Sequence, residues 1–183
     1  DLETDNRYIA WSLDSDGSGP ELGAGLKTEL VDVLDDRWHY YSGTRDASTG
    51  ELKFYIDGLL VDTGISGINT FINPQMIVLS RHVFVNCCGF YGEIDDFSFW
   101  NTKLTQEQVQ NHISLGISGS ETDLIGYWDF NQGSGDILTD KTPYANHGSI
   151  SGATWSTEIP DPSSLVLEEI SLPIHATIAI GSF

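Results

Sequence analysis

Apolar and polar residues alternate along short stretches of this chain, with turn-forming residues between the stretches. In the clearest stretch, Leu52, Phe54 and Ile56 alternate with three residues that would face the other way, Lys53, Tyr55 and Asp57. This period of two predicts a strand with one buried face. A 48–50 turn of Ser, Thr and Gly precedes it, and the Asp57-Gly58 pair after it is typical of a two-residue hairpin turn of the primed type.

Further strands are expected wherever β-branched and aromatic residues gather between turn signals. They fall at Tyr8–Leu13, Leu26–Leu34, Met76–Ser80, Gly92–Asn101, Leu124–Asn131 and Gly148–Trp155. Many short strands at regular spacing predict an all-β fold, an antiparallel β-sandwich of the jelly-roll kind.

A single short helix is expected near residues 105–113. Thr105 is placed as the N-cap, and Gln108 three residues later completes the capping-box pattern. Leu104 and Val109 have the spacing of a hydrophobic staple across that cap. The helix should run from about Gln106 to Ile113.

The composition changes after residue 157. We expect one sandwich over residues 1–157 and a polar, proline-containing linker over 158–164. The segment 165–183 is rich in β-branched residues and contains Pro173, so it is predicted to be a β-strand tail or the start of a following module.

Length and charge narrow the classes of partner. The 183 residues suit one domain with a sizeable core. Eight Lys and Arg stand against 27 Asp and Glu, a formal net charge of −19, which argues against nucleic acid or an anionic membrane as partner. No run reaches the roughly 18 apolar residues of a membrane-spanning helix. Cations, sugars and proteins remain.

The two cysteines, Cys87 and Cys88, are adjacent. Neighbouring Cα atoms lie about 3.8 Å apart, whereas ordinary disulfides need about 4.4–6.8 Å. The pair is therefore either two packed thiols, a strained vicinal disulfide, or bonded to another chain.

Several segments, in order, resemble the laminin-G-like and pentraxin-like (concanavalin A-like) jelly roll of bacterial cell-surface proteins. They are Trp38-His39, the Gly50–Gly58 stretch, the Phe90–Asn101 stretch followed by Leu104-Thr105, and the closing Leu124–Gly135 stretch with Asp140, Asn146-His147-Gly148 and Trp155. The resemblance covers about residues 6–157. It implies a secreted or cell-surface module, and relative to that pattern the chain lacks the opening strands, so we expect them in a longer precursor or another chain.

Glu93-Ile94-Asp95 is similar to the start of a motif in laminarinase-type hydrolases on a related jelly roll. Retaining hydrolysis requires two carboxyl groups about 5–5.5 Å apart. Phe97 and Ser98 stand where the second glutamate would fall. We therefore predict that the chain is not an enzyme.

The first candidate functional site is a calcium site. If Ile94, Phe97 and Phe99 are all in the core, a bulge at Asp95-Asp96 would turn both carboxylates aside. Together with Asp140, Asn146 and backbone carbonyls of the Lys141–His147 loop, they could form the oxygen shell that calcium needs, and many relatives of the resembled family carry calcium. Alternatively, Asp95 and Asp96 only solvate a strand end and Asp140 caps a turn.

A second set of oxygens, Asp14, Asp16 and Ser18, has the spacing of a calcium loop, but Gly25 stands where a glutamate should close it. A polar hairpin tip is the competing interpretation. The scattered histidines show no spacing for a transition metal.

Sugar recognition is the other candidate, through aromatic residues in or near loops: Tyr144, Trp155 and Tyr91. These rings could equally be core or rim packing. The predicted function is a non-catalytic, calcium-stabilised extracellular module that binds glycan or protein. The alternative is a structural repeat of an adhesin or filament that contacts copies of itself through strand edges.

Overall fold

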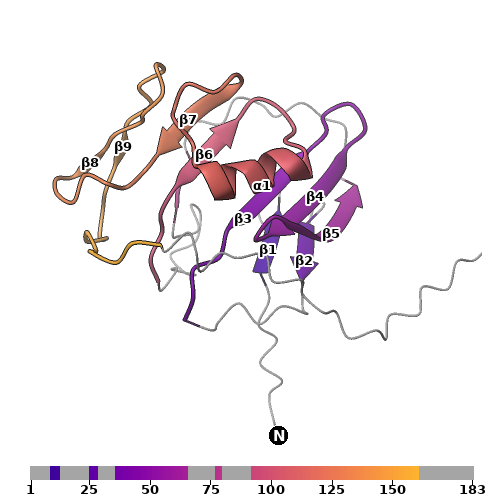
Figure 1. Ribbon diagram of the computed structural model, residues 1–183, viewed down its shortest axis with the longest axis horizontal. Coiled ribbons are helices and arrows are strands. Elements are labelled where there is room, and N and C mark those ends of the chain that lie inside the picture. The colour runs from indigo at the N-terminus through magenta and orange to yellow at the C-terminus, as the bar shows by residue number, and fades with distance from the viewer. Residues whose placement is uncertain (1–8, 13–24, 29–35, 66–76, 80–91, 161–183) are drawn as a thin grey trace, which may run out of the picture.

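The computed structural model describes residues 9–12, 25–28, 36–65, 77–79 and 92–160 (Figure 1). Every strand pair in this part is antiparallel. The sheets are β1 (Ile9–Ser12) with β2 (Gly25–Thr28); β3 (Tyr41–Arg45), β4 (Glu51–Ile56) and β5 (Leu59–Ile65); β6 (Phe97–Trp100) with β7 (Leu124–Trp128); and β8 (Ile137–Leu138) with β9 (Gly148–Ser149). α1 (Gln106–Leu115) is the one helix among these residues. The predicted all-β class is confirmed.

The turn between β4 and β5 is the predicted primed hairpin. Asp57 and Gly58 both have positive φ, 51° and 77°, as a type I′ turn requires. The Asp57 carboxylate accepts hydrogen bonds from the Tyr40 backbone N–H and the His39 ring, each at 2.8 Å. The turn residue therefore also fixes the chain that enters β3.

β4 supplies two of the largest fully buried side chains of the described part, Leu52 and Ile56. Leu52, Phe54 and Ile56 are at most 3% exposed, as their alternation predicts. Tyr55 on the other face is also only 3% exposed, so the prediction of a single buried face is wrong at this position. It packs in one cluster with Leu104 and Val109, because α1 covers that face of the sheet.

α1 begins as the sequence indicates. Thr105 accepts a hydrogen bond from the Gln108 backbone N–H, and the Gln108 side chain accepts one from the Thr105 N–H. The helix ends at Leu115, two residues beyond the predicted end, where Gly116 has a positive φ of 77°. The side-chain amides of Gln106 and Gln110 both donate to the Gly58 carbonyl oxygen at 3.1 Å, which joins the helix to the β4–β5 turn.

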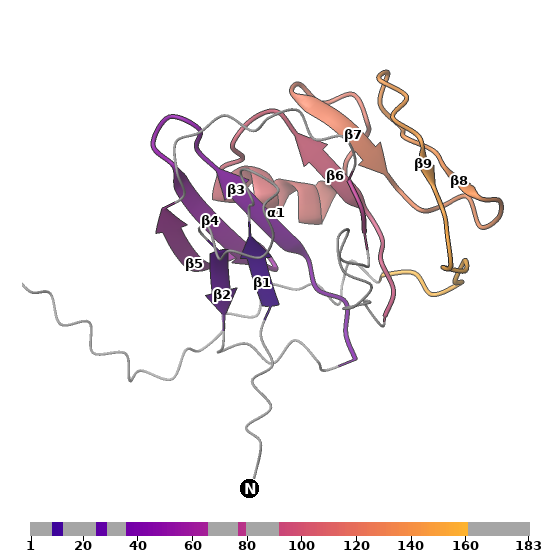
Figure 2. The same ribbon diagram turned by 180° about the vertical axis from the view of Figure 1, so that it is seen from behind.

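The described elements are layered. α1 lies on one side of the β3–β4–β5 sheet and the β1–β2 hairpin lies on the other, as the two opposite views show (Figures 1 and 2). β6 and β7 continue beside β3, and β8 with β9 lies on the outer side of β7, away from α1 (Figure 1). The last hairpin is therefore peripheral to the sheet that carries the main core.

The segment before β6 differs from the prediction. The strand begins at Phe97, and its irregularity lies at Phe99/Trp100 opposite β7, not at Asp95-Asp96. Phe99 is 41% exposed, so the three apolar residues that motivated the bulge are not all in the core. Asp96 instead takes a positive φ of 50° just ahead of the strand.

Other strands are shorter than expected. β7 and β9 end at Trp128 and Ser149, because the residues after them turn into loops. Residues 77–79, inside the predicted Met76–Ser80 strand, belong to no strand. Positions 161–183, which hold most of the predicted linker and the whole predicted tail, lie outside the described residues.

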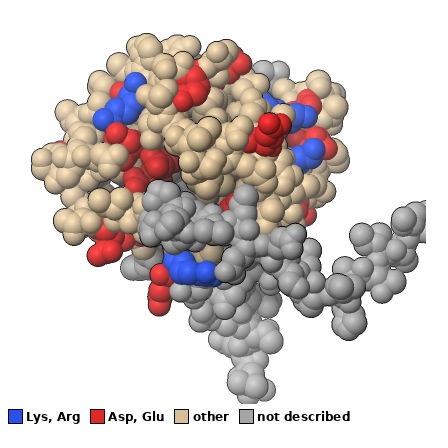
Figure 3. Space-filling model, viewed as in Figure 1, with Lys and Arg blue, Asp and Glu red and all other residues tan. Residues whose placement is uncertain are grey.

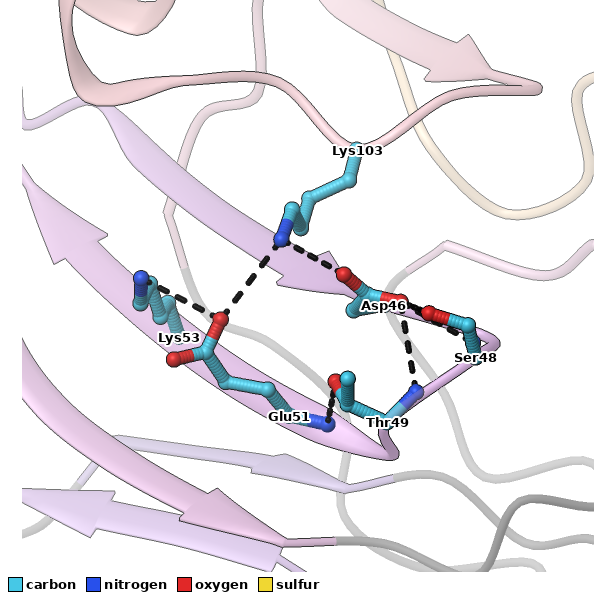
Figure 4. Close-up of polar contacts among 6 residues, drawn as sticks. All are labelled: Asp46, Ser48, Thr49, Glu51, Lys53 and Lys103. Atoms are coloured by element: carbon cyan, nitrogen blue, oxygen red, sulfur yellow. Dashed lines mark hydrogen bonds and ion pairs between the residues drawn. The ribbon is translucent and has the colours of Figure 1, made fainter.

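A polar network that the sequence did not suggest joins the β3–β4 turn to the entry of α1 (Figure 4). The Lys103 ammonium lies 2.7 Å from the Asp46 carboxylate and 3.6 Å from that of Glu51. Asp46 also accepts hydrogen bonds from the hydroxyl and backbone N–H of Ser48. The hydrogen bond from Lys103, followed by those from Ser48, holds the Asp46 pKa well below its usual range. These exposed contacts fix the turn more than they stabilise the fold.

Candidate functional site

The Asp140 carboxylate organises the loop between β8 and β9, residues 139–147, which we call the β8–β9 loop. It is 4% exposed. One oxygen, Oδ1, accepts hydrogen bonds from the backbone N–H groups of Tyr127 and Thr142, at 3.0 and 2.9 Å. The other, Oδ2, accepts from the Thr142 hydroxyl at 2.9 Å and the Asn146 N–H at 2.8 Å. One carboxylate therefore ties both ends of this loop to β7.

The same loop covers the outer edge of β7. The Asn146 side-chain amide donates to the Ile125 carbonyl oxygen at 2.9 Å, and the Lys141 N–H donates to the Tyr127 carbonyl oxygen at 2.7 Å. With the bond from the Tyr127 N–H to Asp140, these contacts replace a neighbouring strand. They satisfy backbone groups that an edge strand would leave open to pairing with another chain.

These contacts bear on the predicted calcium shell. Burial alone would raise the Asp140 pKa, but the hydrogen bonds from Tyr127, Thr142 and Asn146 lower it, so the group is an anion that protein donors already neutralise. Among the described residues, no group of three or more His, Cys, Asp and Glu side chains is arranged to hold a metal ion. Asp140, Asp95 and Asp96 therefore do not form such a group, and protein donors already contact both Asp140 oxygens; calcium binding stays a prediction.

Asp95 and Asp96 lie at a separate polar patch at the ends of β6 and β7. The Tyr127 hydroxyl donates to the Asp96 carboxylate at 2.6 Å. Burial, then the neighbouring Asp96 charge, raises the pKa of Asp95, and Asp129 adds to that effect. Asp129 itself pairs with Lys141 at 2.9 Å. Figure 3 shows acidic side chains gathered on the part of this face that β6 to β9 form.

The aromatic candidates have different environments. Tyr144, on the β8–β9 loop, is 63% exposed. Trp155 is half-buried, and its indole N–H donates to the Gly135 carbonyl oxygen at 2.8 Å, so this ring has a structural contact. Tyr91 lies outside the described residues, as do Asp14, Asp16, Ser18, Cys87 and Cys88.

Sequence reasoning missed several residues of this region. The Thr142 hydroxyl binds Asp140, and the Tyr127 hydroxyl binds Asp96. The exposed His147 accepts a hydrogen bond at Nδ1 from the Asp140 backbone N–H at 3.2 Å. The Asn146-His147-Gly148 stretch, which leads into β9, was visible in the sequence. The approach of its histidine to the backbone of residue 140 depends on the closure of the loop.

Residues of the segment that resembles a hydrolase motif make packing contacts within the β6–β7 sheet. Glu93 is exposed. Phe97 stacks on Trp128 with ring centroids 5.6 Å apart, and the Ser98 hydroxyl accepts a hydrogen bond from the Trp100 indole at 2.9 Å. The two positions that would have to supply a second carboxylate thus serve the β6–β7 sheet.

No helix among the described residues has the length and apolar character to cross a membrane.

Comparison with known proteins gives the family. No curated protein matches the chain. A crystal structure of a "putative carbohydrate binding protein" from Bacteroides ovatus ATCC 8483 is similar, with a TM-score of 0.61 and 18% identity. The match covers 81% of this chain and 46% of that one, so this chain spans less than half of that protein, and the likeness supports the fold alone. The family model described as the concanavalin A-like lectin/glucanases superfamily matches residues 2–110. The chain therefore belongs to the concanavalin A-like lectin/glucanase superfamily.

Proposed function

We propose that the chain is a non-catalytic extracellular module that binds glycans through the β8–β9 loop. The observation that carries the proposal is the Tyr144 ring, which is 63% exposed on a loop whose two ends are tied to a buried carboxylate. An aromatic face held in place can stack on the apolar face of a sugar with little ordering cost. Membership of a lectin-containing superfamily, and the carbohydrate binding ascribed to the structural neighbour, support a binding role.

The charge of the chain favours neutral sugars over polyanions. The formal net charge is −19, and the patch of Asp95, Asp96 and Asp129 lies beside Tyr127, to which the loop is bound. A sulfated or uronate-rich glycan would approach against this field, whereas a neutral one would not. The packing roles of Phe97 and Ser98 support a binding function without hydrolysis.

Calcium and self-assembly remain separate proposals. Protein donors occupy both Asp140 oxygens, which favours the second predicted set of calcium ligands, Asp14, Asp16 and Ser18, over the set around Asp140. Sedimentation of the purified chain distinguishes the two functions. A monomer is expected for a glycan-binding module, and a polymer is expected for a repeat that contacts its own copies.

Binding to immobilised laminarihexaose, cellohexaose, N-acetylchitohexaose and a sulfated heparin fragment tests the proposal. We expect the wild-type chain to bind a neutral hexasaccharide and not the heparin fragment. Tyr144→Ala should weaken that binding about tenfold, equivalent to about 1.4 kcal/mol. Tyr144→Trp should keep it. Leu115→Ala is the matched control, since Leu115 is 83% exposed at the end of α1. No binding to any neutral hexasaccharide, or full binding by Tyr144→Ala, would contradict the proposal.

A further inference from the structure

The Asp140 backbone N–H contacts one of the two ring nitrogens of His147. It donates to His147 Nδ1 over 3.2 Å. A backbone N–H can only donate, so Nδ1 must carry a lone pair and not a proton. In the neutral imidazole the proton then belongs to Nε2. The loop thus selects one of the two neutral tautomers of His147.

The Nε2–H of this tautomer is available to a ligand. His147 is exposed, and within the described part of the chain no residue accepts a hydrogen bond from its Nε2. The Nε2–H therefore has no acceptor among the described residues, and it lies on the loop that also carries the exposed Tyr144. The two side chains are three positions apart, a span of at most about 11 Å along an extended chain, which suits one or two sugar rings.

The backbone between these two residues is held in place. The Ala145 N–H donates to the Thr142 carbonyl oxygen at 3.3 Å, and the His147 N–H donates to the Ala145 carbonyl oxygen at 2.9 Å. Between them, the Asn146 N–H is bound to the buried Asp140 carboxylate. Neither side chain needs a backbone rearrangement before it can bind, which lowers the ordering cost of association.

We infer that His147 is a ligand-binding residue whose Nε2–H donates a hydrogen bond to an oxygen of a neutral sugar stacked on Tyr144. This inference rests on the proposed function and adds the polar contact that orients the ligand. A neutral donor suits a hydroxyl, ring or N-acetyl oxygen and gives no preference for an anion. The loop lies beyond residues 2–110, so the superfamily match does not itself assign a site there, and the inference rests on the contacts of the loop.

Two substitutions of His147 test the roles of its two ring nitrogens separately. In His147→Asn the amide oxygen can take the place of Nδ1 and accept from the Asp140 N–H, but nothing replaces the Nε2–H donor. In His147→Gln the longer amide can reach the Nε2 position, whereas the acceptor for the Asp140 N–H is lost. Melting temperature reports the contact within the loop, and binding to laminarihexaose, cellohexaose and N-acetylchitohexaose reports the outward contact.

We expect His147→Asn to melt as the wild type does and to bind the preferred neutral hexasaccharide about tenfold more weakly. His147→Gln should melt at a lower temperature and bind more tightly than His147→Asn. If His147 only supports the loop, the order of the two variants in binding is reversed, and that result would overturn the inference.

A nitrogen-15 NMR spectrum of the imidazole provides a readout that needs no glycan. At neutral pH the long-range coupling pattern should identify His147 as the Nε2–H tautomer, and an Nδ1–H tautomer would overturn the inference even if glycan binding is observed. A wild-type chain with the expected tautomer that binds none of the neutral hexasaccharides would instead contradict the proposed function, and with it the ligand role of His147.

Discussion

The contact of α1 with β4 and the contact of the β8–β9 loop with β7 both attach a peripheral segment to a sheet, but by different forces. The first is apolar: Tyr55, Leu104 and Val109 form one buried cluster. Burying such side chains stabilises a protein by about 1.5–3 kcal/mol each. The second depends on one carboxylate, Asp140, that accepts four hydrogen bonds from three residues.

This difference has a functional consequence. An apolar contact uses the side chains of the segment it attaches, so α1 presents Val109 and Ile113 inward. The loop is held by its own backbone N–H groups and by the side chains of Asp140, Thr142 and Asn146. This arrangement leaves Tyr144 and His147 exposed. A segment anchored through its backbone can therefore combine a fixed conformation with side chains that are available to a ligand.

The largest effect on stability should come from the apolar region. Leu52→Ala removes a side chain that is 0% exposed in β4 and should lower the free energy of unfolding by about 2–5 kcal/mol. Leu60→Ala on β5, where the residue is 43% exposed, is the control and should cost much less. Urea denaturation followed by tryptophan fluorescence measures both. Equal losses in the two variants would mean that β4 does not form the central core.

A smaller and pH-dependent effect is expected in the loop region. Asp140→Asn keeps the shape of the side chain but turns an NH₂ group toward backbone donors, and should cost about 1.5–3 kcal/mol at pH 7. The pKa of Asp140 is lowered in the folded state, so its contribution is present above the unfolded pKa of about 3.9 and is lost as the pH falls through the folded value. The cost of the substitution should therefore vanish in strong acid. A cost that does not change with pH would show that the charge is not the stabilising feature.

A still smaller effect should appear at the edge of the apolar region. His112 stacks on Trp100 with centroids 4.7 Å apart, and burial lowers its pKa although the Glu121 charge opposes this. The unfolded chain then binds more protons, so stability should fall as the pH drops below about 6.5. His112→Phe keeps a stacked ring that cannot titrate. We expect its melting temperature to fall less than that of the wild type between pH 7.5 and 5.5, and identical slopes would contradict this account.

No effect at all is expected when the loop is tested for calcium. Because both Asp140 oxygens are occupied by protein donors, Asp140→Asn should not change the response of the melting temperature to EDTA, whatever that response is in the wild type. If EDTA lowers the wild-type melting temperature by several degrees and leaves Asp140→Asn unaffected, then Asp140 is a calcium ligand, as the sequence pattern alone had indicated.

Elements whose signals are local could be predicted from the sequence without the structure. The capping box of α1, the type I′ turn at Asp57-Gly58 and the alternation of Leu52, Phe54 and Ile56 each depend on residues within a few positions of one another, and each is confirmed. The superfamily was also recognisable from ordered motifs. Such features are set by backbone geometry and side-chain period, which a single chain displays directly.

The roles of the remaining polar residues depend on contacts between distant parts of the chain. Tyr55 is buried because α1, about fifty positions later, packs over it, and Lys103 pairs with Asp46 across a similar separation. Asp140 was selected from the sequence as a calcium ligand, yet its partners are backbone N–H groups of Tyr127, Thr142 and Asn146, which carry no signature in the sequence. A carboxylate meets backbone donors and metal ions with the same two oxygens. Whether a carboxylate binds backbone donors or a metal ion depends on which of these groups the fold brings within about 3 Å of its oxygens. Residue type and spacing along the chain do not determine that distance.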